Sequence, residues 1–539
     1  AAVSANGGAT IDPALMREAV ARPHARLTVI VREADPASDA AETLVAGLGG
    51  TVTHELPIVG GFSAEVPASS VPAFGASAAV ARLWGDASLH MNSVDMSKFN
   101  SLPINTLWQP SINLPQARDA LNAGPFLGQG VTVALLDTGV SAVPDLGNRV
   151  LARVDLTPDH DGIDRYGHGT HMAGLIAGSG AKSLGLYQGV APKARLVSVK
   201  VASADGSTDV SVVLAGLEWV VEHEATYGIR VLNLSFGTDS TQSYSVDPLD
   251  YAVEQVWFSG IAVVVSAGNR GPSSGTINKP ADDPYVISVG SADMKNTFDL
   301  GDDTVASFSS LGPTQDGIGK PDVVAPGMSL VSERAVGSTI DVNNPTARVG
   351  DYYFKGSGTS QSAAVVSGVL ALMFQADPTL TPDVAKAIVV GGAQKYLASQ
   401  PGAGAGLIDA FSAVKATLRQ RYVSRPANQN LTPSTGLGSL EASRGSYHVY
   451  ADLDGDGTPD LVTGEVDVLG AAWDGQSWTA RSWSADAWDS SEWSAYTATT
   501  AGWSDTSWSG RSWTGTTWDG RSWTGTTWDG RSWSDAGWS

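Results

Sequence analysis

Buried parallel strands are predicted from short apolar runs between residues 103 and 422. The runs cover residues 131–136, 195–201, 230–234, 261–266 and 285–290, and helix-like segments separate them. A strand that is covered on both faces gives a continuous apolar run, whereas a strand with one wet face alternates. Such strands alternating with helices predict an α/β domain built on a parallel sheet.

A different pattern occupies residues 26–94. RLTVIVRE is typical of a strand, DAAETLVAGLGG of a helix that ends in Gly, and TVTHELPIVGGFSAEVP of two strands joined around Pro57 to Gly61. SSVPAFGASA then predicts a helix and VARLW a final strand. This order predicts a small α+β, ferredoxin-like (split βαβ) domain. We place that domain and the segment after it at 11–102, with residues 1–10 as a loose arm.

Residues 423–470 are predicted to be a linker with an acidic loop. Residues 423–446 are rich in Ser, Pro, Asn and Gly, and DLDGDGTPDLV follows. Hard oxygen ligands at this spacing suit Ca²⁺, but Thr463 stands where a calcium loop of the EF-hand kind has its bidentate Glu. A solvated acidic turn is the alternative. The candidate metal ligands are Asp452, Asp454, Asp456, Thr458 and Asp460.

The last part of the chain, residues 471–539, is a repetitive Trp-rich tail. Trp recurs every five residues from 473 to 493 and again from 503 to 538, and RSWTGTTWDG occurs twice in succession. Five residues turn a helix by roughly 140°, so this spacing gives no apolar stripe. A repetitive β-coil, stacked small hairpins and a disordered chain remain open.

Composition limits the classes of partner and compartment. The chain of 539 residues carries a formal net charge of −22, which argues against binding nucleic acid or an anionic membrane. It has no Cys, which excludes disulfides, and no apolar run long enough for a transmembrane helix. Because it begins at Ala1 without a basic or apolar leader, we expect a form whose signal peptide has been removed.

Four short strings carry the parts needed for acyl transfer. They contain Asp137 in LLDTG, His168 in GHGTHMAG, Asn269 in SAGN and Ser360 in GSGTSQSAA. A Ser nucleophile needs a base within hydrogen-bond reach and a carboxylate that orients this base. An Asn side chain beside a backbone N–H can stabilise the oxyanion. Together the four residues predict nucleophilic catalysis.

The order and the flanking strings resemble the subtilisin-like serine proteases over residues 100–420. The resemblance implies that Asp137 orients the base, His168 is the general base and acid, Ser360 is the nucleophile and Asn269 is the oxyanion donor. It also implies that LNLSFG contains the strand that pairs with an extended peptide. The substrate-binding residues expected from that string are Ser235, Phe236 and Gly237.

The same resemblance gives the flanking parts a role. The 26–94 unit resembles the propeptide inhibitor of this family, which implies a zymogen whose active cleft is blocked by the tail of the unit, at about residues 87–102. One departure stands after the nucleophile, where the family has Met, Ala, any residue and Pro, and this chain has Gln361, Ser362, Ala363 and Ala364. The change puts the shape of the leaving-group side in doubt.

These features predict a secreted or cell-surface serine endopeptidase that acts on proteins or peptides. Its partners would be substrates and its own propeptide, with Ca²⁺ as a structural cofactor. The Trp tail would attach to cell-wall polysaccharide, associate with other copies of itself or serve as a spacer. The alternative is a non-catalytic scaffold on a protease fold, in which the tail is the working part.

Overall fold

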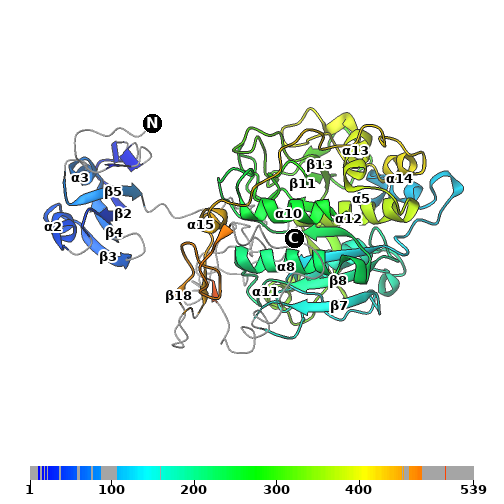
Figure 1. Ribbon diagram of the computed structural model, residues 1–539, viewed down its shortest axis with the longest axis horizontal. Helices are drawn as coiled ribbons and strands as arrows, with labels where there is room; N and C mark the ends of the chain where they lie inside the picture. The colour runs from blue at the N-terminus through cyan, green and yellow to red at the C-terminus, as the bar shows by residue number, and fades with distance from the viewer. Residues whose placement is uncertain are drawn as a thin grey trace. The chain divides into compact units, whose positions relative to one another are not determined.

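The computed structural model describes residues 10–11, 15–16, 19–20, 22–35, 38–56, 61–74, 77–85, 106–157, 159–451, 453, 460–475 and 504–505. The chain divides into two compact units, Ala1–His90 and Met91–Ser539. Each unit is described by itself below, and Figure 1 labels the elements of both.

The first unit is a five-stranded sheet with short helices. Its elements are β1 (Thr10–Ile11), β2 (Arg26–Glu33), α2 (Ala40–Gly47), β3 (Thr51–Leu56), β4 (Gly61–Pro67), η2 (Ala68–Ser70), α3 (Val71–Phe74) and β5 (Val80–Gly85). The strands lie in the order β1-β5-β2-β4-β3, and the four long ones pair antiparallel. Strand β1 pairs parallel with β5, so the sheet begins at Thr10, which we had expected to lie in a loose arm.

An eight-stranded sheet forms the centre of the second unit. Its strands are β6 (Thr132–Asp137), β7 (Val150–Asp155), β8 (Arg195–Lys200), β9 (Ile229–Leu234), β10 (Ala262–Ser266), β11 (Ile287–Asp293), β12 (Thr304–Val305) and β13 (Val323–Pro326). They lie in the order β12-β11-β10-β9-β6-β8-β7, with β13 also paired to β11, and only the β11–β12 pair is antiparallel. All five predicted apolar runs are strands of this sheet.

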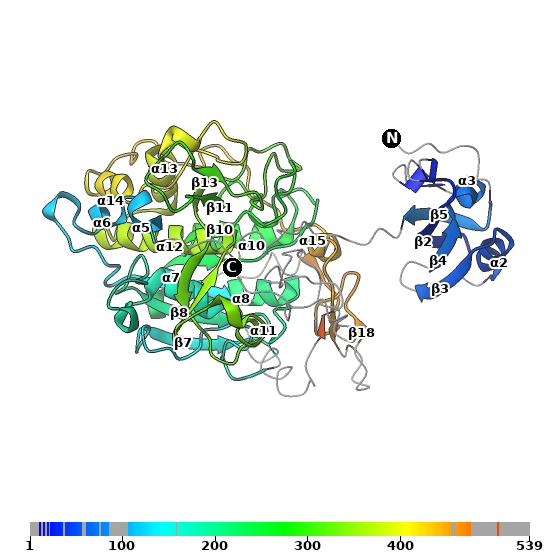
Figure 2. The ribbon, with the colours of Figure 1, turned by 180° about the vertical axis from the view of Figure 1, so that it is seen from behind.

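Helices cover both faces of the sheet. Those that frame the sheet are α7 (His168–Ala177), α8 (Val210–Glu222), α10 (Pro248–Phe258), α12 (Thr359–Ala376), α13 (Pro382–Gly392) and α14 (Ala410–Leu418). Helices α8 and α10 pack together on one face, and α7 and α12 on the other (Figures 1 and 2). This arrangement explains why every residue of β6 is buried.

Smaller elements complete the second unit. The helical ones are α5 (Trp108–Ser111), α6 (Leu114–Arg118), η3 (Ala120–Asn122), η4 (Ala181–Ser183), α9 (Glu224–Tyr227), α11 (Thr339–Asn343), η5 (Pro345–Ala347) and η6 (Lys395–Leu397). A separate antiparallel sheet has the order β14-β16-β15, with strands β14 (Leu330–Glu333), β15 (Arg348–Val349) and β16 (Tyr353–Gly356). Among the described residues, one helix is long and apolar enough to cross a membrane, and it is α12, with 89% of its window buried inside the protein.

The segment expected to be a linker is folded against the parallel-sheet part of the second unit. We call residues 434–451 and 460–475 the C-terminal strap. It contains α15 (Leu440–Arg444), β17 (Val449–Ala451) and β18 (Asp460–Leu461), and β19 (Ser504–Asp505) pairs with β17. Buried apolar side chains of the strap belong to the same core as the parallel sheet. They include Leu440, Val449, Val462 and Val468.

One buried ion pair joins the strap to the start of α8. The Nε of Arg444 donates to Asp209 Oδ2 at 2.7 Å, and both side chains are fully buried. Asp209 is also the N-cap of α8, where it accepts from the backbone N–H of Ser211. Burial alone would raise the pKa of Asp209, but the charge and hydrogen bonds of Arg444 and the Ser211 bonds hold this pKa below its usual range.

Candidate active site

Asp137 and His168 form a buried, hydrogen-bonded pair. Asp137 is the last residue of β6 and is 1% exposed, and His168 is the first residue of α7. The imidazole Nδ1 lies 2.7 Å from Asp137 Oδ1. A carboxylate only accepts, so Nδ1 carries the proton and Nε2 is left as the basic nitrogen.

The residues around this pair explain how the strand and the helix come so close. A Cβ on Gly169 would stand 2.1 Å from the carbonyl oxygen of Gly139 and 3.2 Å from Asp137 Cβ, so only Gly fits after His168. The backbone N–H of Gly169 donates to Thr138 Oγ1 at 2.9 Å. The backbone N–H of Thr138 donates to Asp137 Oδ1 at 2.8 Å, which fixes the carboxylate.

Asp164 is a part of the site that the sequence analysis missed. This buried carboxylate accepts from the backbone N–H groups of Gly167 (2.6 Å) and Thr170 (2.7 Å), so it caps the N-terminal turn of α7. It also accepts from Thr138 Oγ1 at 2.8 Å, which connects it to the neighbour of Asp137. The available signal was an Asp four residues before the His that opens a helix.

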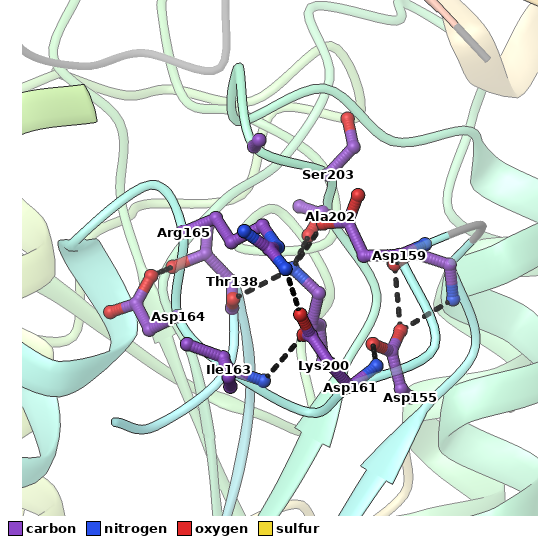
Figure 3. Close-up of polar contacts among 12 residues, drawn as sticks. Thr138, Asp155, Asp159, Asp161, Ile163, Asp164, Arg165, Lys200, Ala202 and Ser203 are labelled. Carbon is purple, nitrogen blue, oxygen red and sulfur yellow. Dashed lines mark hydrogen bonds and ion pairs between the residues drawn. The ribbon is translucent and has the colours of Figure 1, made fainter. Parts of the chain in front are cut away.

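A buried Lys binds the backbone next to Asp137. Lys200 ends β8, and its Nζ donates to the carbonyl oxygens of Thr138 (3.3 Å) and Ala202 (3.0 Å) and pairs with Asp159 Oδ2 at 2.9 Å (Figure 3). The side chain of Lys200 is fully buried. It therefore joins the loop before α7 to the strand ends that hold Asp137.

Ser360 lies in the first turn of α12, which packs against α7. It is 5% exposed, and its Oγ donates to the carbonyl oxygen of Ser235 at 3.0 Å. Ser235 follows β9, the strand next to β6. Connections leave β6 and β9 in opposite directions, which is the switch point where open α/β sheets place their sites.

Asn269 is held beside the residue that precedes Ser360. Its Oδ1 accepts from the backbone N–H and from the Oγ1 of Thr359, both at 3.0 Å. Two donors on the oxygen fix the orientation of the amide. The Nδ2 group is thereby left as a donor on the side of the amide that does not contact Thr359.

The 235–237 segment lies against a second backbone segment. The backbone N–H of Thr238 donates to the carbonyl oxygen of Lys279 at 3.0 Å, and a Cβ on Gly237 would stand 2.0 Å from that oxygen. Close packing against the Lys279 carbonyl therefore explains why position 237 is Gly. Phe236 is partly buried and packs against Tyr447 of the strap.

Comparisons with known proteins show the family of this chain. The Subtilase family (Peptidase_S8) matches residues 128–411, which is more than half of the chain. The chain belongs to the subtilase family. Within that family it is a serine endopeptidase of the subtilisin type, built on a subtilisin-like α/β domain.

Two curated relatives show how far the likeness extends. Serine protease AprX of Bacillus subtilis is 40% identical over 319 residues, covering 58% of this chain and 72% of that protein. Subtilisin Savinase of Lederbergia lenta is 36% identical over 269 residues, covering 50% of this chain and 84% of that protein. The solved structure of a cold adapted subtilisin-like serine proteinase matches 53% of this chain and 88% of that chain at 30% identity, with a TM-score of 0.40.

Gln361 and Ser362, which directly follow Ser360, are the residues at which the sequence analysis expects a departure from the family. Gln361 is fully buried, and neither atom of its amide group has a hydrogen-bond partner among the described residues. Ser362 instead donates to the carbonyl oxygen of Ala325 at 3.0 Å. Both side chains belong to α12, whose first turn is bound to Asn269 and Ser235.

A second His on α7 stays neutral. Burial, followed by the charge of His168, lowers the pKa of His171 to about 3. Its Nε2 lies 3.1 Å from the carbonyl oxygen of Phe354. At neutral pH, His171 therefore adds no positive charge next to His168.

The predicted calcium loop is described only in part. Asp460 begins β18, and its Oδ2 accepts from the backbone N–H of Leu453 at 3.3 Å. The other candidate ligands lie outside the described residues. They are Asp452, Asp454, Asp456 and Thr458. In the part of the chain that is described, no group of three or more His, Asp or Glu side chains is arranged to hold a metal ion.

Proposed function

We propose that this subtilase hydrolyses peptide bonds through Asp137, His168 and Ser360. The observation that carries the proposal is the 2.7 Å contact between His168 Nδ1 and Asp137, which leaves Nε2 as the base. The Ser360 hydroxyl, which donates to Ser235 O, turns to His168 when the nucleophile is activated. The proton passes to Nε2 as Oγ attacks the carbonyl carbon.

The negative charge on the substrate oxygen is then stabilised at the start of α12. Asn269 supplies its Nδ2 donor, and the backbone N–H of Ser360 supplies the second. The helix dipole favours the same charge. His168 returns its proton to the leaving amine, and a water molecule repeats the sequence on the acyl-enzyme, releasing Ser360.

A fluorophosphonate probe tests this assignment directly. We expect the probe to label Ser360, and the unmodified protein to hydrolyse an unfolded protein substrate. His168→Ala is the matched control, because it keeps the hydroxyl but removes its base. Absence of both labelling and hydrolysis in the purified protein would support the scaffold alternative.

We also propose that the 26–94 unit is an inhibitory propeptide of a secreted zymogen. Its strand order β5-β2-β4-β3 supports this, together with its place directly before the catalytic part. The separated unit should inhibit the catalytic part in trans. Normal processing of the Ser360→Ala protein when it is produced alone would show that another protease removes the unit.

Calcium binding and the Trp tail complete the proposal. The acidic spacing of residues 452–460 supports a calcium site, so Ca²⁺ should raise the melting temperature through these residues. Residues 471–539 should bind a polysaccharide surface or other copies of the tail. A chain that ends near residue 475 should then keep its activity on soluble peptides but lose sedimentation with cell-wall material.

A further inference from the structure

The residues that follow Ser235 run beside the C-terminal strap. Ser235 is next to the nucleophile, because its carbonyl oxygen accepts from Ser360 Oγ at 3.0 Å. Residues 236–239 continue from it, and we expect residues 235–237 to pair with an extended peptide substrate. Whatever holds residues 236–239 in place therefore also holds the surface along which that peptide would lie.

Two side chains of this segment contact the strap directly. Phe236 packs against Tyr447, whose side chain is 2% exposed. Thr238 is 1% exposed, and its Oγ1 donates to the carbonyl oxygen of Ser443 at 2.7 Å. Because Thr238 and Tyr447 are buried, water does not compete for these contacts. One apolar contact and one hydrogen bond thus join the segment to the strap.

Asp239 binds the strap through both of its carboxylate oxygens. Oδ1 accepts from the backbone N–H of Ser446 at 2.8 Å, and Oδ2 accepts from Ser446 Oγ at 2.6 Å. The strap passes so close that a Cβ on Gly445 would stand 2.3 Å from Asp239 Oδ1 and 2.6 Å from the backbone nitrogen of Ser240. Two bonds from one residue hold the carboxylate in a single orientation.

A second backbone segment fixes the main chain of Thr238. Thr238 and Lys279 form an antiparallel bridge, with N–H···O bonds of 3.0 and 2.9 Å. Lys279 is itself held, since its Nζ is bound to Asp250 at 2.5 Å and to Asp282 at 2.7 Å. The main chain of the segment therefore depends on Lys279, and its side chains depend on the strap.

Arg444 holds the strap turn that makes these contacts. It stands within residues 443–446, and its side chain is bound to the buried Asp209 at 2.7 Å. It also donates to the carbonyl oxygens of Gly464 at 2.8 Å and Val466 at 2.5 Å. A support that is itself locked by packing and hydrogen bonds can keep a binding surface in its productive geometry.

We infer, on the basis of the proposed function, that Ser443, Ser446 and Tyr447 of the strap position residues 235–239 for peptide binding. They are positioning residues, which act on the substrate through Phe236 to Asp239. Affinity for a peptide that runs along this segment should depend on them, whereas the reactivity of Ser360 should not. The strap lies outside residues 128–411, which match the family. This support is therefore an addition to the matched domain.

Two Thr→Val changes test the inference as a matched pair. Thr238→Val keeps the shape of the side chain and removes the bond to Ser443, so KM for a tetrapeptide p-nitroanilide should rise about 3- to 10-fold with kcat little changed. Hydrolysis of p-nitrophenyl acetate, which has no peptide chain, should change far less. Thr435→Val removes the same kind of bond between the strap and another segment, from Oγ1 to the Ser245 carbonyl oxygen at 3.1 Å, and should leave both substrates unaffected.

A second pair of variants changes the strap itself. Ser446→Ala removes the bond to Asp239 Oδ2 and should also raise KM for the tetrapeptide, and Ser446→Thr, which keeps a hydroxyl, should restore it. An unchanged KM in Thr238→Val and Ser446→Ala, or an equal loss on peptide and ester, would overturn the inference, while fluorophosphonate labelling of Ser360 still upheld the proposed function. If Ser360 were not labelled and neither substrate were hydrolysed, both would be overturned.

Discussion

The candidate active site and the C-terminal strap use their polar groups in opposite ways. Arg444 in the strap donates five hydrogen bonds, to Asp209 twice and to Glu441, Gly464 and Val466. Asn269 in the site accepts two hydrogen bonds from Thr359 on its side-chain oxygen, which leaves its Nδ2 group as the remaining donor. A group whose hydrogen-bond donors all have partners stabilises the fold, whereas a group with a donor left over can bind a reacting substrate.

The largest expected effect is a loss of activity without a loss of stability. Ser360→Ala should lower kcat on a peptide by about a million-fold, as loss of the nucleophile does in a catalytic triad. Stability should hardly change, because the hydroxyl has one hydrogen bond, to Ser235 O. Parallel rate and thermal-unfolding measurements check both statements, and residual activity within tenfold of the unmodified protein would contradict the role of Ser360 as the nucleophile.

The strap should show the converse behaviour. Arg444→Met leaves Asp209 buried without its cation, which should cost about 3–5 kcal/mol of unfolding free energy. Denaturant unfolding measures the loss, and Arg425→Met at an exposed position is the control. The rate of Ser360 labelling per folded molecule should be unchanged, and a large fall in that rate would show that the strap also shapes the site.

Asn269→Ala tests whether the Asn269 amide donates to the oxyanion. Loss of one oxyanion donor should lower kcat about 10²–10³-fold, with KM little changed. Thr359→Val is a graded companion, because it removes the Oγ1 bond to Asn269 Oδ1 but keeps the backbone N–H bond. A change confined to KM would move Asn269 out of the oxyanion role.

The smallest effect concerns pH and a carboxyl group that faces the strap. Burial, then the nearby carboxyl of Asp283, raises the pKa of Glu254 from 4.5 to about 10, and Glu254 Oε2 accepts from the backbone N–H of Ser434 at 2.8 Å. The folded protein therefore keeps a proton that the unfolded chain releases. This contribution is fully present below pH 4.5 and is lost as the pH rises toward 10.

Glu254→Gln should remove this pH dependence. The amide imitates the protonated group, so the variant should lose a slope of about 1.4 kcal/mol per pH unit between neutral pH and pH 9. Melting temperatures at a series of pH values measure the slope. Identical pH profiles for the two proteins would mean that Glu254 is ionised in the folded state.

The sequence predicted the strands and the chemistry because both are carried by local strings. Asp137 and His168 each stand in a short motif, and the buried strands are apolar runs. β7 was missed because as an edge strand it alternates between half-buried and exposed residues. Lys200 was missed because its role depends on contacts with a neighbouring strand end, such as the 3.3 Å bond to the Thr138 carbonyl oxygen. Asp164 was missed although its bonds to Gly167 and Thr170 are local.

The strap was predicted as a linker for a related reason. Ser, Pro and Gly between 423 and 446 are typical of a connection, and this composition does not show which side chains will be buried. Arg444 was not an obvious core residue, since Arg is rarely buried unless paired. Its partner Asp209 lies 235 residues earlier, where no local pattern indicates it.

The buried ion pair between Arg444 and Asp209 cross-links distant parts of the chain, as a disulfide would. It joins positions 235 residues apart in a chain without cysteine, so it closes a long loop by charge and hydrogen bonds alone. An ion pair does not react with thiols or oxidants, whereas disulfides are broken or reshuffled by them. Because the pKa of Asp209 is held low, only strong acid should open it. This ion pair should therefore hold equally well in reducing and in oxidising surroundings.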